Sequence, residues 1–84
     1  MKYLVITMRT PSFDPQQIPA HYRFLDDLRD RGMLEQAGPF TDKTGGAYVL
    51  TAGSLDEALR LAQQDPLHRQ RCSTIEVREW DSNG

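Results

Sequence analysis

His21 and Asp65 are the residues of this sequence whose types and positions best suit acid–base chemistry. His21 lies in the first turn of one predicted helix, and Asp65 lies at the end of another, immediately before Pro66. A carboxylate beside an imidazole fixes the tautomer of the ring and favours its protonated form, which suits a general base or acid that works near neutral pH. The pair therefore predicts proton transfer, provided that the fold brings the two side chains together.

Both residues also have a purely structural interpretation. A lone inward histidine in a small domain is often a hydrogen-bonded core residue, and an aspartate before a proline often only marks the end of a helix. Two buried polar groups that need partners can satisfy each other, so a functional pair His21–Asp65 and a structural one stay equally open.

Four further residues are predicted to contact a substrate near the same edge of the fold. Arg9 ends a predicted strand and would neutralise a negative charge on the ligand, although a solvated strand end is a common alternative. Gly38 and Pro39 end a second strand, where backbone groups could balance negative charge that develops during a reaction. His68 lies in a turn that either lines the cleft or faces solvent.

Neither a metal nor an organic cofactor is expected. His21, His68 and Cys72 lack the C-x-x-C and H-x-x-x-H spacings of metal ligands. Gly45-Gly46 is typical of a hairpin, and no G-x-G-x-x-G or following Lys-Ser/Thr indicates a phosphate-binding loop. Cys72, the only cysteine, fits a small strand residue better than a nucleophile.

Length and composition predict a single domain over residues 1–84, with an ordered core at 1–80 and a tail at 81–84. A net charge of −2, with 10 basic and 12 acidic residues interspersed, argues against nucleic-acid or membrane partners. No apolar run approaches the roughly 20 residues of a membrane span, and the pattern of a signal peptide is absent. A single cysteine fits a reducing compartment, so a cytoplasmic location is expected.

Hydrophobic periodicity predicts four strands, the first and third of them apolar on both faces. Tyr48 and Trp80 are expected in the core or at a dimer face, and Leu67–Arg71 is expected to be a linker turn. The predicted strands are residues 2–9, 34–39, 47–51 and 72–80.

Two helices are predicted between these strands. The first runs from Pro19 to Arg31 and ends at Gly32. The second begins at the capping box Ser54-x-x-Glu57 and ends near Asp65. The residues expected on the buried faces are Tyr22, Leu25 and Leu28 in the first helix and Leu55, Ala58, Leu59 and Ala62 in the second.

This order of elements predicts an α+β, ferredoxin-like βαββαβ fold with a four-stranded antiparallel sheet. Right-handed crossovers place both helices on one face of the sheet, and His21 and Asp65 then meet at one edge. The opposite face stays bare although two strands are apolar there, which predicts a homodimer that packs through this open sheet face. Such a partner would also stabilise a chain short enough to bury only about 60–65% of its unfolded surface.

A set of short motifs spans residues 21–80, namely His21-x-x-x-Leu25-x-x-Leu28-x-x-x-Gly32-x-Leu34, Ala37-Gly38-Pro39, Ser54-x-x-Glu57-Ala58, Asp65-Pro66, Val77 and Trp80. In this order they resemble the YciI-like (YCII-related) family. The resemblance implies a dimeric α+β barrel related to muconolactone isomerase, with a site built on a histidine and an aspartate that map to His21 and Asp65. It also implies isomerase-, lyase- or dehydrochlorinase-like chemistry without a metal or organic cofactor.

The expected function is a cofactor-free enzyme, an isomerase or lyase, that uses His21 and Asp65 on a small cyclic or carbonyl-bearing metabolite. The alternative is a non-catalytic module, in which the same cleft binds a small ligand or the dimer engages a partner. In a third interpretation the domain is a structural dimer with His21 packed in a solid interior, and a cavity there would count against it.

Overall fold

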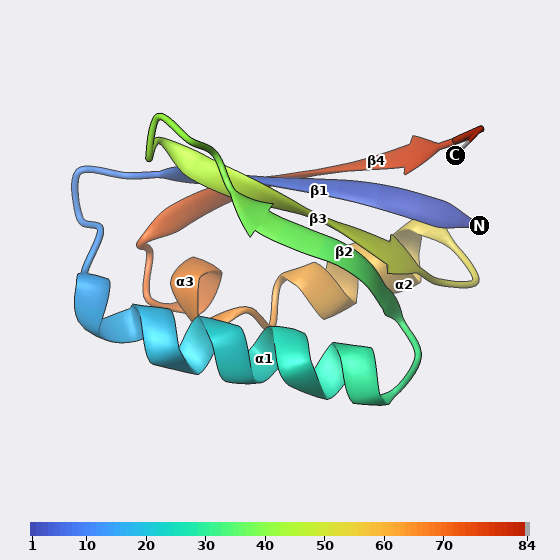
Figure 1. Cartoon of the computed structure of the whole chain (residues 1–84), viewed down its shortest axis with the longest axis horizontal. Coiled ribbons are helices and arrows are strands. Elements are labelled where there is room, and N and C mark those ends of the chain that lie inside the picture. The colour runs from blue at the N-terminus through green and yellow to red at the C-terminus, as the bar shows by residue number, and fades with distance from the viewer. Residues whose placement is uncertain (84) are drawn as a thin grey trace.

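An antiparallel sheet carries all the helices on one of its faces (Figure 1). The computed structural model describes residues 1–83, and its four strands lie in the order β2-β3-β1-β4. The predicted α+β, ferredoxin-like βαββαβ architecture is confirmed. The elements in chain order are β1 (Lys2–Arg9), the 3-10 helix η1 (Pro15–Gln17), α1 (Ile18–Asp30), β2 (Leu34–Pro39), β3 (Gly45–Thr51), α2 (Leu55–Ala62), α3 (Pro66–Arg69) and β4 (Ser73–Trp80).

The central strand β1 pairs with β3 on one side and with β4 on the other. Val5 and Thr7 are buried under the helices, whereas Leu4 and Ile6 lie on the opposite face and are only partly buried. Residues directly opposite each other in antiparallel strands share a face, so Tyr48 of β3, opposite Val5, also lies under the helices. The core therefore lies between sheet and helices, and the other face of the sheet is bare (Figure 1).

The predicted first helix is present as α1 (Ile18–Asp30), and a buried stripe of Leu25 and Leu28 holds it on the sheet. The predicted burial of Tyr22 is wrong, because this side chain is 50% exposed. At about 100° per residue, positions 21, 25 and 28 form one stripe along a helix. His21 therefore occupies the inward position in the first turns of α1.

The predicted start of α2 is confirmed, since Ser54 Oγ accepts a hydrogen bond from the backbone N–H of Glu57 over 3.1 Å. Its predicted buried face is wrong in part. The helix packs on β4 and β1 with a stripe that contains two alanines, because small side chains let a helix approach a sheet closely. Ala58, Leu61 and Ala62 are buried, whereas Leu55 and Leu59 are 49% and 37% exposed.

The predicted linker turn at Leu67–Arg71 is also wrong, because Pro66–Arg69 form the short helix α3. Asp65 is the N-cap of α3, and its Oδ1 accepts a hydrogen bond from the backbone N–H of Leu67 over 2.9 Å. Proline suits the first helical position, where no backbone N–H is needed. Asp65 thus belongs to the start of α3, and α2 ends earlier than predicted, at Ala62.

The remaining strand boundaries shift slightly. β3 begins at Gly45, which pairs with Met8, and β4 begins at Ser73. Trp80 at the end of β4 is 43% exposed, and its predicted place at a dimer face stays a prediction. Residues 81–83 form no regular element, and Gly84, the last residue of the predicted tail, lies outside the described residues.

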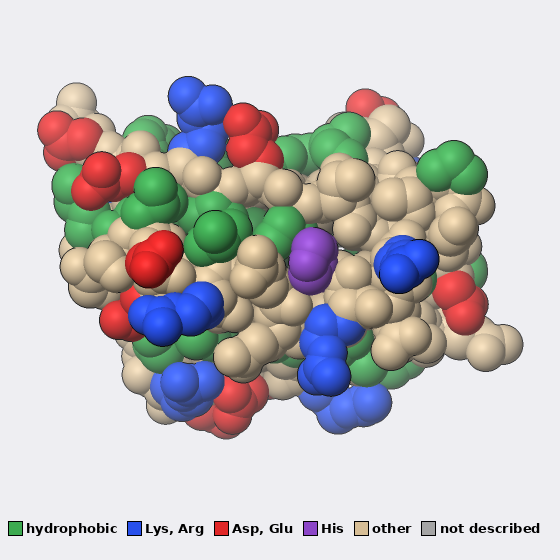
Figure 2. Space-filling view, turned by 180° about the vertical axis from the view of Figure 1, so that it is seen from behind, with side chains coloured by type: hydrophobic (Ala, Val, Ile, Leu, Met, Phe, Trp, Pro, Cys, Tyr) green, Lys and Arg blue, Asp and Glu red, His purple; other side chains and the backbone are tan. Residues whose placement is uncertain are grey.

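The surface on the side of β4, α2 and α3 carries acidic and basic side chains interspersed with apolar ones (Figure 2). No single sign of charge dominates this view, in keeping with the net charge of −2. Within residues 1–83, none of the helices is long and apolar enough to cross a membrane.

Candidate active site

A hydrogen bond joins α1 to the start of α3. His21 Nδ1 donates to Oδ1 of Asp65 over 2.9 Å and lies 2.8 Å from Oδ2. Asp65 is fully buried, and the side chain of His21 is 15% exposed. Because an ionised carboxylate only accepts hydrogen bonds, the proton of the neutral ring sits on Nδ1. Nε2 then keeps its lone pair, and the structure brings the predicted pair together.

The carboxylate of Asp65 is held from two helices. Oδ1 accepts hydrogen bonds from both His21 and the backbone N–H of Leu67. Oδ2 lies beside His21 Nδ1 but has no hydrogen bond of good geometry with any atom of residues 1–83. A buried carboxylate is costly unless its charge is compensated, so this contact also supports the fold.

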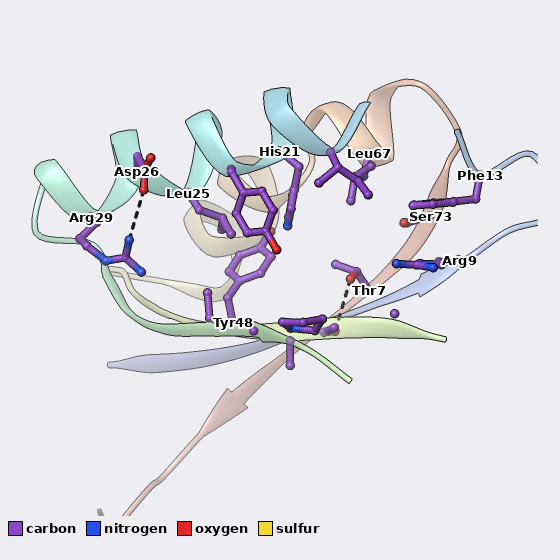
Figure 3. Close-up of a pocket in the computed structure, with 18 residues that line it drawn as sticks. Thr7, Arg9, Phe13, His21, Leu25, Asp26, Arg29, Tyr48, Leu67 and Ser73 are labelled. Carbon is purple, nitrogen blue, oxygen red and sulfur yellow. Dashed lines mark hydrogen bonds and ion pairs between the residues drawn. The ribbon is translucent and has the colours of Figure 1, made fainter. Parts of the chain in front are cut away.

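A cavity of about 220 Å³ lies between α1 and the sheet (Figure 3). His21 points into it from α1, and Arg9, Gly38 and Pro39, three of the predicted contact residues, also line it. His68 is not among its lining residues. A cavity at this place counts against a solid interior around His21.

The floor of the cavity is the inner face of the sheet around Gly46. This residue pairs with Thr7 on β1 and with Pro39 on β2. A Cβ atom at Gly46 would lie 2.7 Å from the carbonyl oxygen of Gly38, so a side chain here would push β2 away from β3. Thr7 Oγ1 donates a hydrogen bond to the Gly46 carbonyl over 3.3 Å. Gly46 therefore keeps the strands in close contact beneath the cavity.

Tyr48 rises from β3 toward α1 and lines the same cavity as His21 (Figure 3). It is 2% exposed, and its hydroxyl has no hydrogen-bond partner in the part of the chain that the structure describes. Burial and, to a smaller extent, the negative charge of Asp65 raise the pKa of Tyr48 far above its ordinary value, so the phenol stays neutral. The alternation of β3 predicts that Tyr48 points inward but gives no sign of a cavity.

Each end of the cavity carries an arginine (Figure 3). At one end the guanidinium of Arg9 lies over the ring of Phe13, with its central carbon 4.1 Å from the ring centroid, and Ser73 lines the cavity there. At the other end Arg29 pairs with Asp26 over 3.2 Å. The sequence does not predict a role for Phe13 or Ser73. The strand register that sets Ser73 opposite Arg9 is the signal that could have identified the serine.

Other reactive groups lie elsewhere. Cys72 is 1% exposed and is not one of the residues that line the cavity. In residues 1–83, no three side chains of His, Cys, Asp or Glu are grouped so that they could hold a metal ion. Of the side chains that line the cavity, His21 is the one best suited to accept and return a proton near neutral pH.

Comparisons with known proteins agree with this architecture. A model of the YCII-related domain matches residues 1–81. The chain is 45% identical over 78 residues to the uncharacterised protein YjpA of Bacillus subtilis (strain 168). The aligned region covers 93% of this chain and 92% of that protein.

Two solved enzymes share the fold. 5-Chloro-2-hydroxyhydroquinone dehydrochlorinase from Burkholderia phenoliruptrix AC1100, solved in complex with 2,5-dihydroxybenzoquinone, superposes with a TM-score of 0.81 at 21% identity, covering 96% of this chain and 94% of that one. Muconolactone isomerase superposes with a TM-score of 0.69 at 18% identity, covering 100% of this chain and 96% of that one. At these identities the likeness establishes the architecture.

The raised pKa of Tyr48 predicts a loss of stability at alkaline pH that Tyr48→Phe should reduce. The unfolded chain, whose tyrosines ionise near pH ~10, loses this proton before the folded protein does. The stabilisation is therefore complete below about pH 10 and falls by about 1.4 kcal/mol per pH unit above it. Urea unfolding at about pH 8 and about pH 11 should show a smaller drop in the free energy of unfolding for the variant; equal drops would contradict the assignment.

Proposed function

The chain belongs to the YCII-related domain family, and on this premise we propose that it is a cofactor-free acid–base enzyme. In this proposal His21, oriented by Asp65, moves a proton on a small cyclic or carbonyl-bearing molecule. The observation that carries the proposal is the 2.9 Å hydrogen bond from His21 Nδ1 to the fully buried carboxylate of Asp65. The side chain of His21 also lines the cavity.

The hydrogen bond to Asp65 prepares His21 for both halves of a proton transfer. Its Nε2 lone pair takes a proton from a carbon next to the substrate's carbonyl. The C–H electron pair forms a C=C bond, and the π electrons of the carbonyl move onto its oxygen as an enolate forms. The imidazolium that results is stabilised by the negative charge of Asp65. Arg9 and the backbone near Gly38, which line the cavity, balance the negative charge on the substrate.

Two outcomes follow from the same enolate. If the ring also holds a C=C bond conjugated with the enolate and His21 Nε2 returns its proton to the far carbon of that bond, the C=C bond shifts and the reaction is an isomerisation. If the electron pair instead expels an anion from a neighbouring carbon while His21 keeps the proton, the reaction is an elimination that a lyase or a dehydrochlorinase would catalyse. Atoms and electrons balance in both cases, and neither outcome needs an oxidant or a reductant.

The size of the cavity supports a substrate of about one ring. Its volume of about 220 Å³ is below the roughly 300–1,000 Å³ of pockets for drug-sized ligands. The structural neighbour with a TM-score of 0.81 was solved with 2,5-dihydroxybenzoquinone, a single six-membered ring with two carbonyl groups. This compound is therefore the first binding probe to use.

Catalysis can be tested without knowing the natural substrate. In heavy water, wild-type protein should accelerate the exchange of the hydrogens next to the carbonyl of cyclohexanone, followed by proton NMR. In His21→Ala the exchange rate that the protein adds should fall by about 10²-fold or more, as expected for the loss of a general base. The matched control is His68→Ala, since His68 is the only other histidine and does not line the cavity.

The outcomes separate the two candidate functions. Binding of 2,5-dihydroxybenzoquinone together with exchange that depends on His21 supports the enzyme. Binding without any exchange favours the alternative, a non-catalytic module that binds a small ligand. Equal exchange in wild type and His21→Ala would contradict the role of His21.

The bare face of the sheet is proposed to pack against a second copy of the chain. Leu4 and Ile6 are partly exposed on this face, and Met8 is 40% exposed. Burial of such a surface would stabilise a small domain whose single cysteine permits no internal disulfide.

The cytoplasmic location expected from the sequence stays a prediction.

Ile6→Lys should convert the dimer to a monomer, because it places a charge at the centre of the proposed interface. Sedimentation velocity over a range of protein concentrations measures the effect. The control is Leu59→Lys, which changes an exposed leucine on α2, on the other side of the sheet, and should leave the dimer intact. A monomeric wild type, or an Ile6→Lys variant that remains dimeric, would contradict the proposed interface.

A further inference from the structure

Arg9 and Ser73 are cross-strand partners at one end of the cavity. They lie directly opposite each other where β1 pairs with β4, so their side chains share a face of the sheet. Thr7, two residues before Arg9, is buried under the helices, which makes this face the inner one. Both residues line the cavity that also contains His21 (Figure 3).

The guanidinium of Arg9 is oriented but not neutralised. It lies over the ring of Phe13, with its central carbon 4.1 Å from the ring centroid. This stacking uses the face of the guanidinium and leaves the N–H groups in its plane available. Within the described chain Arg9 pairs with no carboxylate, whereas Arg29 at the opposite end of the cavity pairs with Asp26.

Ser73 places a hydroxyl beside Arg9. The residue is 5% exposed, and it lines the cavity. A serine hydroxyl can both donate and accept hydrogen bonds, so it is suited to bind a polar group of a ligand there. The close-up shows Arg9, Phe13 and Ser73 together at this end of the cavity (Figure 3).

We propose that Arg9 and Ser73 form a carboxylate-binding subsite, and that the substrate is a small ring that carries a carboxylate. Arginine binds a carboxylate through two parallel N–H···O bonds, and the serine hydroxyl donates a further bond. The unpaired positive charge of Arg9 complements the negative charge of such a ring. This inference rests on the proposed function, because the subsite and His21 share one cavity.

The carboxylate belongs to the reacting molecule and not to a separate anion. Arg9, Thr7 and His21 all line one cavity of about 220 Å³, so a ring that is bound at Arg9 shares this space with His21. Anchoring the ring at its carboxylate would fix which of its carbons meets Nε2 of His21. The subsite would thus determine both the substrate class and the position of proton transfer.

A matched pair of ligands tests the subsite. 3,5-Dihydroxybenzoate and 3,5-dihydroxybenzamide have the same ring and nearly the same size, but only the first carries a charge. Binding is followed by amide chemical shifts in NMR titrations of the full chain. The acid should bind wild type at least about tenfold more tightly than the amide, as expected for hydrogen bonds to a charged group.

Variants assign this preference to its residues. Arg9→Met should bring the ratio of the two affinities close to one, and Ser73→Ala should lower it by about threefold or more. The control Arg31→Met removes the same charge from a residue outside the cavity and should keep the wild-type ratio. Because Arg9 is exposed at the end of β1, the variant should fold, and its amide spectrum reports this directly.

Each remaining outcome overturns the proposal in an identifiable way. Equal binding of acid and amide to wild type would remove the subsite and leave the proposed function standing. A wild-type ratio in Arg9→Met would also remove it, and so would inorganic phosphate that binds as tightly as the acid, since that would indicate a general anion site. If neither ring binds, the subsite and the ring-binding cavity of the proposed function fail together.

Discussion

The contact between His21 and Asp65 sets the geometry on which the rest of the structure depends. Asp65 is fully buried, and a carboxylate removed from water destabilises a fold strongly unless its charge is compensated. Hydrogen bonds from His21 on α1 and from the backbone N–H of Leu67 on α3 stabilise the buried carboxylate. The same contact therefore joins two helices and determines which ring nitrogen of His21 remains free.

The cavity lies where the sheet carries its smallest side chains. Leu28, farther along α1, is packed in the core, whereas five of the strand residues that line the cavity are glycine or alanine. Polar groups are distributed along it, with the neutral phenol of Tyr48 on β3 and the unpaired cation of Arg9 at one end. A site of this kind suits a molecule on which negative charge is present or develops. The small residues concerned are Ala37, Gly38, Gly45, Gly46 and Ala47.

The sequence predicts much of this arrangement because strand and helix periods indicate which residues share a face. The strand order and the meeting of His21 with Asp65 both follow from the order of the elements and the handedness of their connections. Hydrophobic periodicity does not predict the exact residue at which a helix begins or ends. The sequence predicts Asp65 at the end of the second helix, yet Asp65 is the N-cap of α3, because its carboxylate accepts a hydrogen bond from the backbone N–H of Leu67.

Other features depend on contacts that spacing does not encode. The pattern of α2 fits a stripe with Leu59 as well as one with Leu61, and only packing on the sheet selects Leu61. Phe13 lies in a loop, and its value to the site comes from stacking with Arg9. Nothing in the sequence around Ser73 indicates a role in a site. The strand register places it opposite Arg9, where both residues line the cavity.

The tautomer of His21 tests the central claim most directly, and nitrogen-15 NMR of the ring measures it at a pH where the imidazole is neutral. The account predicts that His21 carries its proton on Nδ1, that Nε2 is unprotonated, and that Asp65→Asn weakens this preference. His68, the other histidine, provides an internal reference in the same spectra. A neutral His21 with its proton on Nε2, or a tautomer unaffected by Asp65→Asn, would contradict the account.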